Sequence, residues 1–415
     1  MTRETTASAT DLVRVGKGTL GGDWLRRYWL AVSRAEDLHD VPQAVRLLGE
    51  DLVLFRDGAG RPGLLGIACP HRGTSLEYGD AEAAGLRCPY HGWLFDVTGQ
   101  CLEQPAEPKD STFYRRVRHT AYPVRELGGL LFAYLGPDGD DPPPLPRYAP
   151  LVEPGQRQLE PPRHLDYNWF NFWENSADPC HISILHRFSA YGAQTWGNQF
   201  FDYHDMPAFE PVEQDYGLTI VMRKPGPTPD TEFVDEMSLA LPSVIQIGDT
   251  EFVHLRLEQA EALAGGSHNA HLLFLTPTDD DHFTIFTVDN YTGPEPDFFA
   301  RLQQMRAHEV PRQAVASYDR RKYMPFRGSV RDEDVVTQAT QGLLGERSER
   351  LATSDRGVIA LRRIAREAAE AARRGARPKG VLAPEQADEV IRLDTFVGMR
   401  PKSAVPARYT GAPAG

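Results

Sequence analysis

The chain has 415 residues, of which 41% are hydrophobic and 25% are charged, and its formal net charge is −13 at pH 7. At roughly 100–200 residues per domain, this length predicts two domains, and the composition is that of a globular protein with a sizeable core. The acidic balance argues against non-specific nucleic-acid binding, which needs a basic face to replace phosphate counterions. The sequence also predicts no membrane span, because the apolar run Leu130–Leu135 is far shorter than the roughly 18–20 residues required.

The N-terminus and the cysteine content indicate the compartment. The first sixteen residues are polar and lack the apolar stretch of a secretory signal, so we expect a cytoplasmic protein. A large chain in a reducing compartment does not need disulfides. The cysteines are therefore expected to be buried hydrophobic residues, nucleophiles or metal ligands; they are Cys69, Cys88, Cys101 and Cys180.

The first third of the chain has the pattern of a small antiparallel β domain. Short apolar segments at Val45–Leu48 and Leu52–Phe55 are separated by turn residues, and a last strand is expected at Leu130–Leu135. Several prolines follow, and each removes a backbone donor, which predicts a semi-rigid linker. We therefore divide the chain into a first domain of residues 20–136, a linker of residues 137–150, and a second domain of residues 151–415, on which residues 1–19 could pack.

The second domain mixes helical and strand-like patterns. A helix is expected around Trp169–His186, and another at Asp355–Arg374, with Ser354 as N-cap and Gly375 just beyond its end. Asp297–His308 also looks helical. The strand-like runs are Leu218–Met222, Val244–Ile247, Phe252–Leu257, His271–Leu275 and Phe283–Val288. A sheet followed by packed helices predicts an α+β fold.

Two short motifs in the first domain carry metal-ligand residues. They are Cys69-Pro70-His71 and, sixteen residues later, Cys88-Pro89-Tyr90-His91. Two such loops facing each other could hold one tetrahedral zinc ion, or a two-iron cluster in which one iron takes both cysteines and the other both histidines. The alternative without metal, two buried cysteines and two polar histidines, requires four ligand-type residues to meet by chance.

The residues around these motifs favour the two-iron cluster. The segments C-P-H-R-G from Cys69, C-P-Y-H-G-W-L-F-D from Cys88, and G-Q-C ending at Cys101 resemble the Rieske [2Fe–2S] domain. The resemblance implies that Cys69 and Cys88 bind one iron and that His71 and His91 bind the other. It leaves Cys101 as a spare cysteine, which we expect to be buried.

A second group of ligand-type residues lies in the second domain. Asp178, His181 and His186 fall within nine residues. Positions 181 and 186 lie about 140° apart on an ideal helix, so both histidines can face one ion only if the helix is distorted or ends between them. Two imidazoles and a distant carboxylate would form the 2-His-1-carboxylate triad of non-haem Fe(II) oxygenases. The alternative is a helix with two hydrogen-bonded histidines and a capping aspartate.

This second segment also resembles a known motif. The pattern E-N-x-x-D-P-x-H-x-x-x-x-H, which begins at Glu174, is similar to the catalytic-domain motif of Rieske non-haem iron oxygenases. The resemblance implies that His181 and His186 are ligands of a mononuclear Fe(II). It implies that Asp178 is a catalytic bridge from an iron-ligand histidine to His91 of the partner subunit.

The third ligand is expected from the stretch Glu333–Gln341. Asp334 and Gln341 have the spacing seen in phthalate- and vanillate-type oxygenases, and this resemblance implies that Asp334 is the ligand. Asp332 and Glu333 are rival ligands, and a solvated acidic run is the alternative without metal. The substrate pocket is expected to involve Asn171, Glu174 and Asn175.

The resemblance covers about residues 20–370 and implies an architecture and an activity. It implies a small antiparallel β Rieske domain, and a larger catalytic domain with an antiparallel sheet covered by helices. The phthalate- and vanillate-type oxygenases have only α subunits and typically form a homotrimer, in which one subunit's cluster lies beside the next subunit's iron. The implied activity is O₂-dependent hydroxylation or oxidative demethylation of an aromatic or related cyclic small molecule by a mono- or dioxygenase.

Electrons for such a reaction are expected from a separate NAD(P)H-dependent reductase, with or without a ferredoxin, because the chain has no Gly-rich dinucleotide fingerprint. Arg115, Arg116 and Arg118, which follow the cluster loops, could dock an acidic redox partner, a solvated basic strand being the alternative. The other functional hypothesis is a non-catalytic Rieske electron-transfer or zinc-binding protein. The triad discriminates between the two, because an electron carrier has no use for it.

Overall fold

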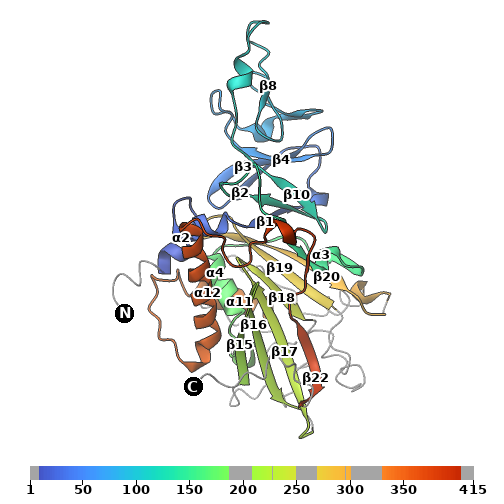
Figure 1. Ribbon diagram of the computed structural model, residues 1–415, viewed down its shortest axis with the longest axis vertical. Coiled ribbons are helices and arrows are strands. Elements are labelled where there is room, and N and C mark those ends of the chain that lie inside the picture. Colours follow the sequence, from blue (N-terminus) through green and yellow to red (C-terminus); the bar gives the residue numbers. More distant parts are fainter. Residues whose placement is uncertain are drawn as a thin grey trace.

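The computed structural model describes residues 9–186, 208–226, 228–248, 269–294, 296–300 and 330–402. A small β-rich domain stands on one end of a larger sheet that helices cover (Figure 1). The fold is α+β, as expected from the sequence. Within the described ranges, every helix is too short or too polar to pass through a lipid bilayer.

The small domain is built from three short antiparallel sheets. Their strand orders are β1-β11-β10, β2-β3-β4-β9 and β5-β6-β7-β8. The expected strands are confirmed at β2, β3 and β11. The strand bounds are β1 Trp29–Arg34, β2 Gln43–Leu47, β3 Glu50–Arg56, β4 Pro62–Gly66, β5 Asp80–Glu82, β6 Gly85–Arg87, β7 Leu94–Phe95, β8 Cys101–Glu103, β9 Ala121–Tyr122, β10 Val124–Leu127 and β11 Leu130–Tyr134.

The tip of the β2–β3 hairpin joins the two domains. Leu48 and Gly49 form a two-residue turn in which both φ angles are positive, +50° and +79°, as a type I′ turn requires. The Leu48 side chain is fully buried in the main hydrophobic core. Its N–H donates to the carbonyl of Pro277 at 3.1 Å, and the N–H of Gly49 donates to that of Thr278 at 2.8 Å. The hairpin is thereby hydrogen-bonded to the large sheet.

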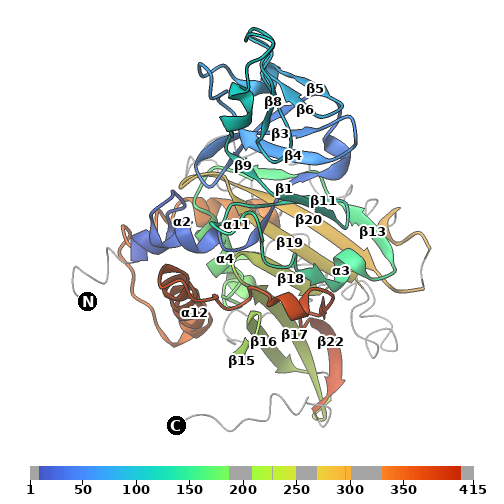
Figure 2. The same ribbon diagram turned by 45° about the horizontal axis from the view of Figure 1, so that its top comes forward.

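The large domain contains an antiparallel sheet that has nine strands in the described part of the chain. The main order is β13-β20-β19-β18-β17-β16-β15, with β14 pairing with β20 and β22 with β17. Figure 2 shows the long strands fanning out beneath the small domain. The bounds are β13 Gln156–Leu159, β14 Arg163–Leu165, β15 Ala208–Gln214, β16 Gly217–Pro225, β17 Thr231–Ala240, β18 Val244–Gly248, β19 Asn269–Pro277, β20 Phe283–Tyr291 and β22 Phe396–Pro401; β12 (Arg147–Tyr148) pairs in parallel with β21 (Val390–Ile391).

The two faces of this sheet pack against different elements. We call one face the helix face: its side chains, among them Ile220, Leu273 and Ile285, share a core with helices α2, α4 and α12. The opposite face includes Leu272 and Phe286, and it packs against β1, β11 and α3. The helix bounds are α2 Leu20–Leu25, α3 Ala149–Val152, α4 Trp169–Asn175, α5 Ile182–Leu185, α11 Val330–Ala339 and α12 Arg356–Arg373.

The helical expectations are correct in part. The single helix expected over 169–186 is wrong, because α4 ends at Asn175 and α5 begins only at Ile182, with Pro179 in the turn between them. The last long helix is confirmed as α12, and Gly375 follows it with φ +73°. Ser354 is not its N-cap: a short 3₁₀ turn precedes the helix and places Asp355 at that position.

Two other expected elements fall mainly outside the described residues. The strand expected at Phe252–Leu257 lies entirely outside them. Of the helix expected at Asp297–His308, only residues up to 300 are described, and residues 298–300 are helical. The strands expected around 218–222, 244–247, 271–275 and 283–288 are confirmed as β16, β18, β19 and β20.

Three tryptophans join the N-terminal segment to the helix α4. Trp24, Trp169 and Trp173 are fully buried, and their ring centroids lie 5.8–6.3 Å apart. The carbonyl of Val13 accepts hydrogen bonds from Trp169 Nε1 at 3.3 Å and from the side-chain amide of Asn168 at 3.1 Å. The segment that precedes β1 thus contributes to the core of the large domain.

Replacing Trp24 by alanine tests the importance of this cluster. We expect Trp24→Ala to lower the free energy of unfolding by about 3–5 kcal/mol, because it leaves a cavity between α2 and α4. The measurement is a urea unfolding curve. Val41→Ala, at a side chain that is 69% exposed, is the control and should change stability by less than about 0.5 kcal/mol. Equal effects of the two changes would contradict the prediction.

Candidate metal centres

The two cysteine–histidine loops of the small domain have the same backbone design. In the first, the N–H of Gly73 donates to the carbonyl of Cys69 at 2.8 Å; in the second, the N–H of Gly92 donates to that of Cys88 at 3.1 Å. Both glycines have positive φ, +78° and +72°, a conformation that other residues rarely adopt. Each loop therefore turns back on its cysteine within four residues.

The sulfur atoms lie inside the domain and the imidazoles lie toward its surface. Cys69 and Cys88 are 2% and 3% exposed and belong to a core that also contains Phe95. Burial raises the pKa of the Cys69 thiol to about 11, although the backbone N–H groups of His71 and Arg72 oppose that shift. Such N–H donors would stabilise the thiolate form that binds a metal.

The four side chains converge in a way that fits a two-iron cluster. The two thiols are close enough to interact, and the rings of His71 and His91 have centroids 4.6 Å apart. The Nδ1 atom of His91 is buried and has no hydrogen-bond partner. A buried polar nitrogen without a partner is costly, whereas a metal ion would use its lone pair. Cys101, the expected spare, is buried and donates instead to the carbonyl of Glu103 at 3.5 Å.

Aromatic side chains lead from this group to the surface. The His71 ring stacks on Trp93, with centroids 4.5 Å apart and planes inclined by 10°. Trp93 in turn contacts Phe113 edge-on at 6.3 Å, and Phe113 is 49% exposed. The exposed arginines singled out in the sequence, Arg115, Arg116 and Arg118, follow directly.

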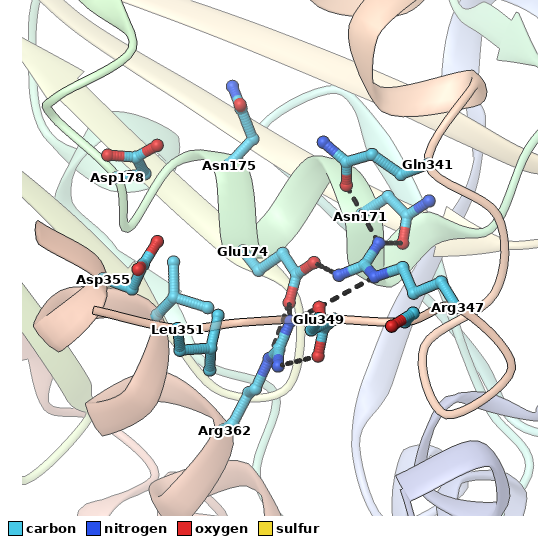
Figure 3. A pocket seen from close by; sticks show the side chains of 12 residues that line it. Asn171, Glu174, Asn175, Asp178, Gln341, Arg347, Glu349, Leu351, Asp355 and Arg362 are labelled. Atoms are coloured by element: carbon cyan, nitrogen blue, oxygen red, sulfur yellow. Dashed lines mark hydrogen bonds and ion pairs between the residues drawn. The ribbon is translucent and has the colours of Figure 1, made fainter.

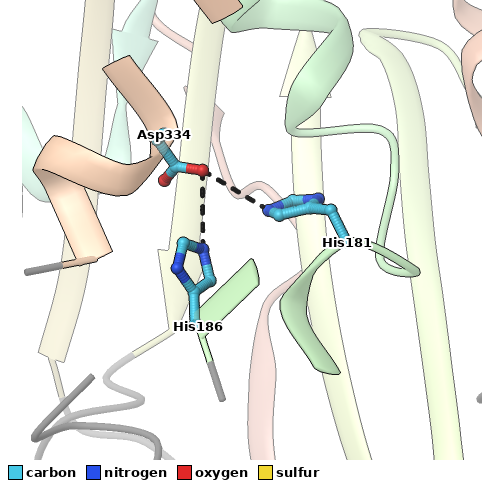
Figure 4. A group of neighbouring side chains, drawn as sticks. All are labelled: His181, His186 and Asp334. Carbon is cyan, nitrogen blue, oxygen red and sulfur yellow. Dashed lines mark ion pairs between the residues drawn. The ribbon is translucent and has the colours of Figure 1, made fainter. Parts of the chain in front are cut away.

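In the large domain, His181 and His186 come together with Asp334, which lies more than 140 residues beyond them in the sequence (Figure 4). The Nε2 atoms of the two histidines lie 3.6 and 3.4 Å from Asp334 Oδ1. One ligand atom from each residue lies within 4.8 Å of the other two. Two imidazoles and one carboxylate thus converge on a single point, which suits a divalent ion with open coordination positions.

The other nitrogen of each imidazole is held by a different acceptor. Nδ1 of His181 bonds to the backbone carbonyl of Asp178, and Nδ1 of His186 bonds to Glu333 Oε2 at 2.9 Å. Both contacts put the proton on Nδ1 and leave Nε2 as the ligand atom. Glu333, a rival ligand in the sequence, is fully buried and in the structure lies behind His186 and not at the converging point. Its position could not be read from spacing, because adjacent helical residues point in different directions.

The charges around the triad also suit a cation. Burial raises the pKa of Asp334, but its contacts with His186, His181 and Asn175 lower it by more, so the net shift is downward. Burial lowers the pKa of His186, but hydrogen bonds to Asp334 and Glu333 raise it by more, to about 9. Buried carboxylates thus favour positive charge at this point, as they would favour a metal ion.

Both histidines follow the break between α4 and α5, His181 directly before α5 and His186 directly after it. Asn175, the last residue of α4, donates to Asp334 Oδ1 at 3.3 Å, and its side-chain nitrogen lies 3.4 Å from His181 Nε2. Of the three residues expected in a substrate pocket, Asn175 is therefore the one beside the triad. After the turn, Asp178 Oδ1 accepts from the N–H of Cys180 at 2.8 Å, and Oδ2 lies 3.8 Å from His181 Nδ1.

Asn171 and Glu174 line a cavity of about 370 Å³ together with Asp178 (Figure 3). Their polar atoms are already engaged. Asn171 donates to the carbonyls of Gln338 and Gly342, each at 3.1 Å, and accepts from Arg347. Glu174 pairs with Arg347 and, at 2.7 Å, with Arg362. These contacts connect α4 to α11 and α12, and so they fix the relative positions of the helices around the triad.

A second carboxylate completes this ion cluster. Glu349 lies 2.8 Å from both Arg347 and Arg362, and its side chain is 25% exposed. Burial raises the pKa of Glu349, but the two arginines lower it by more, so the net pKa lies below the ordinary 4.5. The cluster therefore has two carboxylates facing two guanidinium groups.

Comparisons with known proteins agree with these two centres. The model of the Rieske [2Fe-2S] domain family matches residues 28–123. The phenoxybenzoate dioxygenase subunit alpha of Ectopseudomonas oleovorans is 37% identical, covering 92% of this chain and 89% of that protein. The 5,5'-dehydrodivanillate O-demethylase oxygenase subunit of a Sphingobium strain is 33% identical, over 93% and 85%.

The chain belongs to the Rieske oxygenase family. It is thus an oxidoreductase whose small domain is a Rieske [2Fe–2S] domain, and the alternative of a non-catalytic electron-transfer or zinc protein is not supported. A crystal structure of dicamba monooxygenase bound to dicamba shares the fold, with a TM-score of 0.60, 23% identity, and coverage of 82% of this chain and 96% of that one.

The ion cluster of this oxygenase should make its stability depend on pH. Because Glu349 has a lowered pKa when folded, it stabilises the protein above the ordinary glutamate pKa, and this contribution is lost as the pH falls through the folded value. We expect Glu349→Gln to cost about 1–2 kcal/mol at pH 7. The difference from the wild type should shrink as the pH falls below 4.5 and disappear once Glu349 is protonated in the folded protein, as followed by urea unfolding at each pH. A difference that stays constant with pH would contradict this assignment.

Proposed function

We propose that this oxygenase inserts oxygen from O₂ into an aromatic small molecule, using its Rieske cluster together with a mononuclear Fe(II) held by His181, His186 and Asp334. The observation that carries the proposal is the convergence of these three ligand atoms within 4.8 Å. An iron held by two imidazoles and one carboxylate keeps positions open for O₂ chemistry, which is what this group supplies when bound. Hydroxylation and oxidative demethylation are both within its range.

The protein's own residues prepare this centre. Asp178 and Glu333 hold the two imidazoles through Nδ1, so that both Nε2 lone pairs point to one position. Asn175 orients the carboxylate of Asp334 through its amide. The Glu174–Arg347–Arg362 contacts fix the end of α4, so a ligand set drawn from two distant segments keeps its geometry. The cluster is held in turn by Cys69, Cys88, His71 and His91.

The electron route is proposed to cross between subunits. In Figure 1 the cluster loops lie near β8 at the far end of the small domain, well away from α4 and α11, which flank the triad. We propose that the subunits form a head-to-tail homotrimer, so that His91 of the partner subunit meets Asp178. Asp178 lines the 370 Å³ cavity, which would receive the partner's cluster loops. Its carboxylate would then join that imidazole to His181.

Electrons are proposed to come from a separate NAD(P)H-dependent reductase, directly or through a ferredoxin. The exposed Phe113 contacts Trp93, which stacks on the cluster ligand His71, so a donor docked there would lie close to the cluster. Arg116 and Arg118 have no ion-pair partner among the residues that the structure describes, and they would attract an acidic donor.

The substrate is proposed to be an aromatic carboxylic acid or a relative of one. The two full-length relatives are named for phenoxybenzoate and for dehydrodivanillate, and shorter matches include oxygenase subunits named for phthalate and 3-chlorobenzoate. These names share an aromatic ring with a carboxylate. We carry that shared chemistry to this chain, without choosing one of the compounds.

Iron counting tests the proposed pair of centres. Protein purified without oxygen should contain about three irons per chain, two in the cluster and one at the triad, and show reducible visible bands. His186→Ala should lose one iron and all turnover while its visible bands stay unchanged. A colourless protein containing one zinc ion, or a His186→Ala variant that keeps all its iron, would refute the proposal.

Asp178→Asn tests the electron bridge. We expect full iron content, normal reduction of the cluster, and a fall in turnover of at least about 100-fold, because the amide no longer provides a charged contact for both imidazoles. The measurement is oxygen uptake coupled to product formation. Glu349→Gln is a matched control, since it changes another carboxylate in the same cavity and should retain turnover at neutral pH. Near-normal turnover in Asp178→Asn would remove Asp178 from the route.

A further inference from the structure

We propose that His271 and Asp289 form a polar subsite that binds the anionic oxygen group of the substrate. The proposal rests on the proposed function and adds to it the part of the chain that recognises a carboxylate. The dyad takes no part in the two metal centres described above, and it lies on strands of the large sheet.

The two residues form a closely paired unit. His271 on β19 and Asp289 on β20 stand directly opposite each other in the strand register. His271 Nδ1 lies 2.7 Å from Asp289 Oδ1, and the side-chain amide of Asn269 approaches the same oxygen at 3.5 Å. The Asp289 side chain is only 2% exposed. The buried Asp289 carboxylate thus fixes the orientation of the His271 imidazole, as hydrogen-bonded carboxylates do for functional histidines in other proteins.

The opposite end of the imidazole remains available. The His271 side chain is 20% exposed, and its Nε2 makes no hydrogen bond among the described residues. Since Nδ1–H is donated to Asp289, Nε2 carries either a lone pair or a second proton. An anionic oxygen bound at Nε2 would stabilise the protonated form, which donates to it.

The dyad lies on the helix face of the sheet, which is also the face of the triad-bearing helices. Side chains alternate along a strand, so His271 projects to the same side as Leu273, and Asp289 to the same side as Ile285. Both of those neighbours belong to the core shared with α4. Phe172 of α4 packs against Phe283 farther along β20, with ring centroids 5.9 Å apart.

A chain of contacts connects the dyad to the triad. Asp334 follows Arg331 by three residues on α11, a rise of about 4.5 Å. Arg331 pairs with Glu160 at 3.3 Å, and the N–H of Glu160 donates to the carbonyl of Thr287 at 3.1 Å. Thr287 precedes Asp289 by two residues, about 7 Å along β20. These contacts join the strand that carries Asp289 to the helix that carries Asp334.

His271 begins a row of residues that are paired across neighbouring strands, and the other members of this row are apolar. In the register, His271 is opposite Ile247, which is opposite Met237, which is opposite Ile220. A β-carbon on Gly357 would lie 3.1 Å from Ile220 Cδ1 and 2.1 Å from the carbonyl oxygen of Ala177, so the Ile220 end of this row lies beneath the turn that leads to His181. The row suits an aromatic ring whose carboxylate ends at His271.

Binding measurements that do not require turnover test this subsite. The probes are benzoate, phenoxybenzoate and phthalate, each beside its uncharged carboxamide, titrated into the iron-loaded, oxygen-free protein by calorimetry. We expect at least one acid to bind about 10-fold tighter than its amide, because a hydrogen bond to a charged group contributes about that much to affinity. His271→Leu should bring the two within about twofold, and His271→Gln, which keeps an N–H donor, should restore part of the preference.

The control is His164→Leu. His164 on β14 is hydrogen-bonded to Thr284 of β20 at 2.9 Å, and Thr284 points to the opposite face of the sheet from Ile285. It should leave the preference for acids unchanged. The subsite is refuted if His271→Leu keeps that preference while its iron content is normal, or if no acid binds the wild-type protein better than its amide.

Oxygen uptake with product analysis separates this proposal from the proposed function. Acids that bind through His271 without any oxygen uptake by the reduced, three-iron protein would refute the oxygenase assignment and leave the subsite standing. Turnover of aromatic substrates with equal affinity for acids and amides would refute the subsite alone.

Discussion

Two histidines five residues apart cannot face the same point from one straight α-helix, and the large domain is built around that constraint. His181 and His186 lie directly before and directly after the four-residue helix α5, so neither is held inside a longer helix, and α4 ends ahead of both at Asn175. A broken helix loses the support of its own hydrogen bonds, so the break must be held from outside. Glu174 supplies that support through Arg347 and Arg362, and α11 brings Asp334 to the gap.

The same constraint explains why so many charged groups are buried near α4. Glu174, Glu349 and the two arginines form a nearly closed set, in which each charge faces an opposite one. Removing one partner from such a set leaves an opposite charge less well compensated, so each change within it costs stability. On the other side of the break, the fully buried Glu333 and the half-buried Asp334 both contact His186, where a divalent ion would balance their charge.

Much of this arrangement could be read from the sequence, because short motifs determine it. The cysteine–histidine loops are local structures, and their glycines and cysteines are enough to predict how they turn. A distortion or helix end between His181 and His186 was expected, but the helix ends ahead of both, at Asn175. The sequence could not show this, because the contacts that hold the end of α4 come from Arg347 and Arg362, more than 170 residues away. Glu333 was expected as a rival ligand, because it is a carboxylate next to Asp334 and the sequence does not show in which direction each side chain points. The pairing of His271 with Asp289 depends on strand register, which no local motif records.

The turn at Leu48 and Gly49 has a further consequence for the assembled protein. Its tip is held by two backbone hydrogen bonds to the end of the large sheet, and Leu48 is fully buried there. Swinging one domain against the other would pull an apolar side chain into water and break both bonds. The angle between the domains is therefore a built-in property of each chain and does not behave as a hinge. Any ring that several copies form inherits its curvature from that angle, so a change in this turn would alter how the copies close on one another, far from either metal centre.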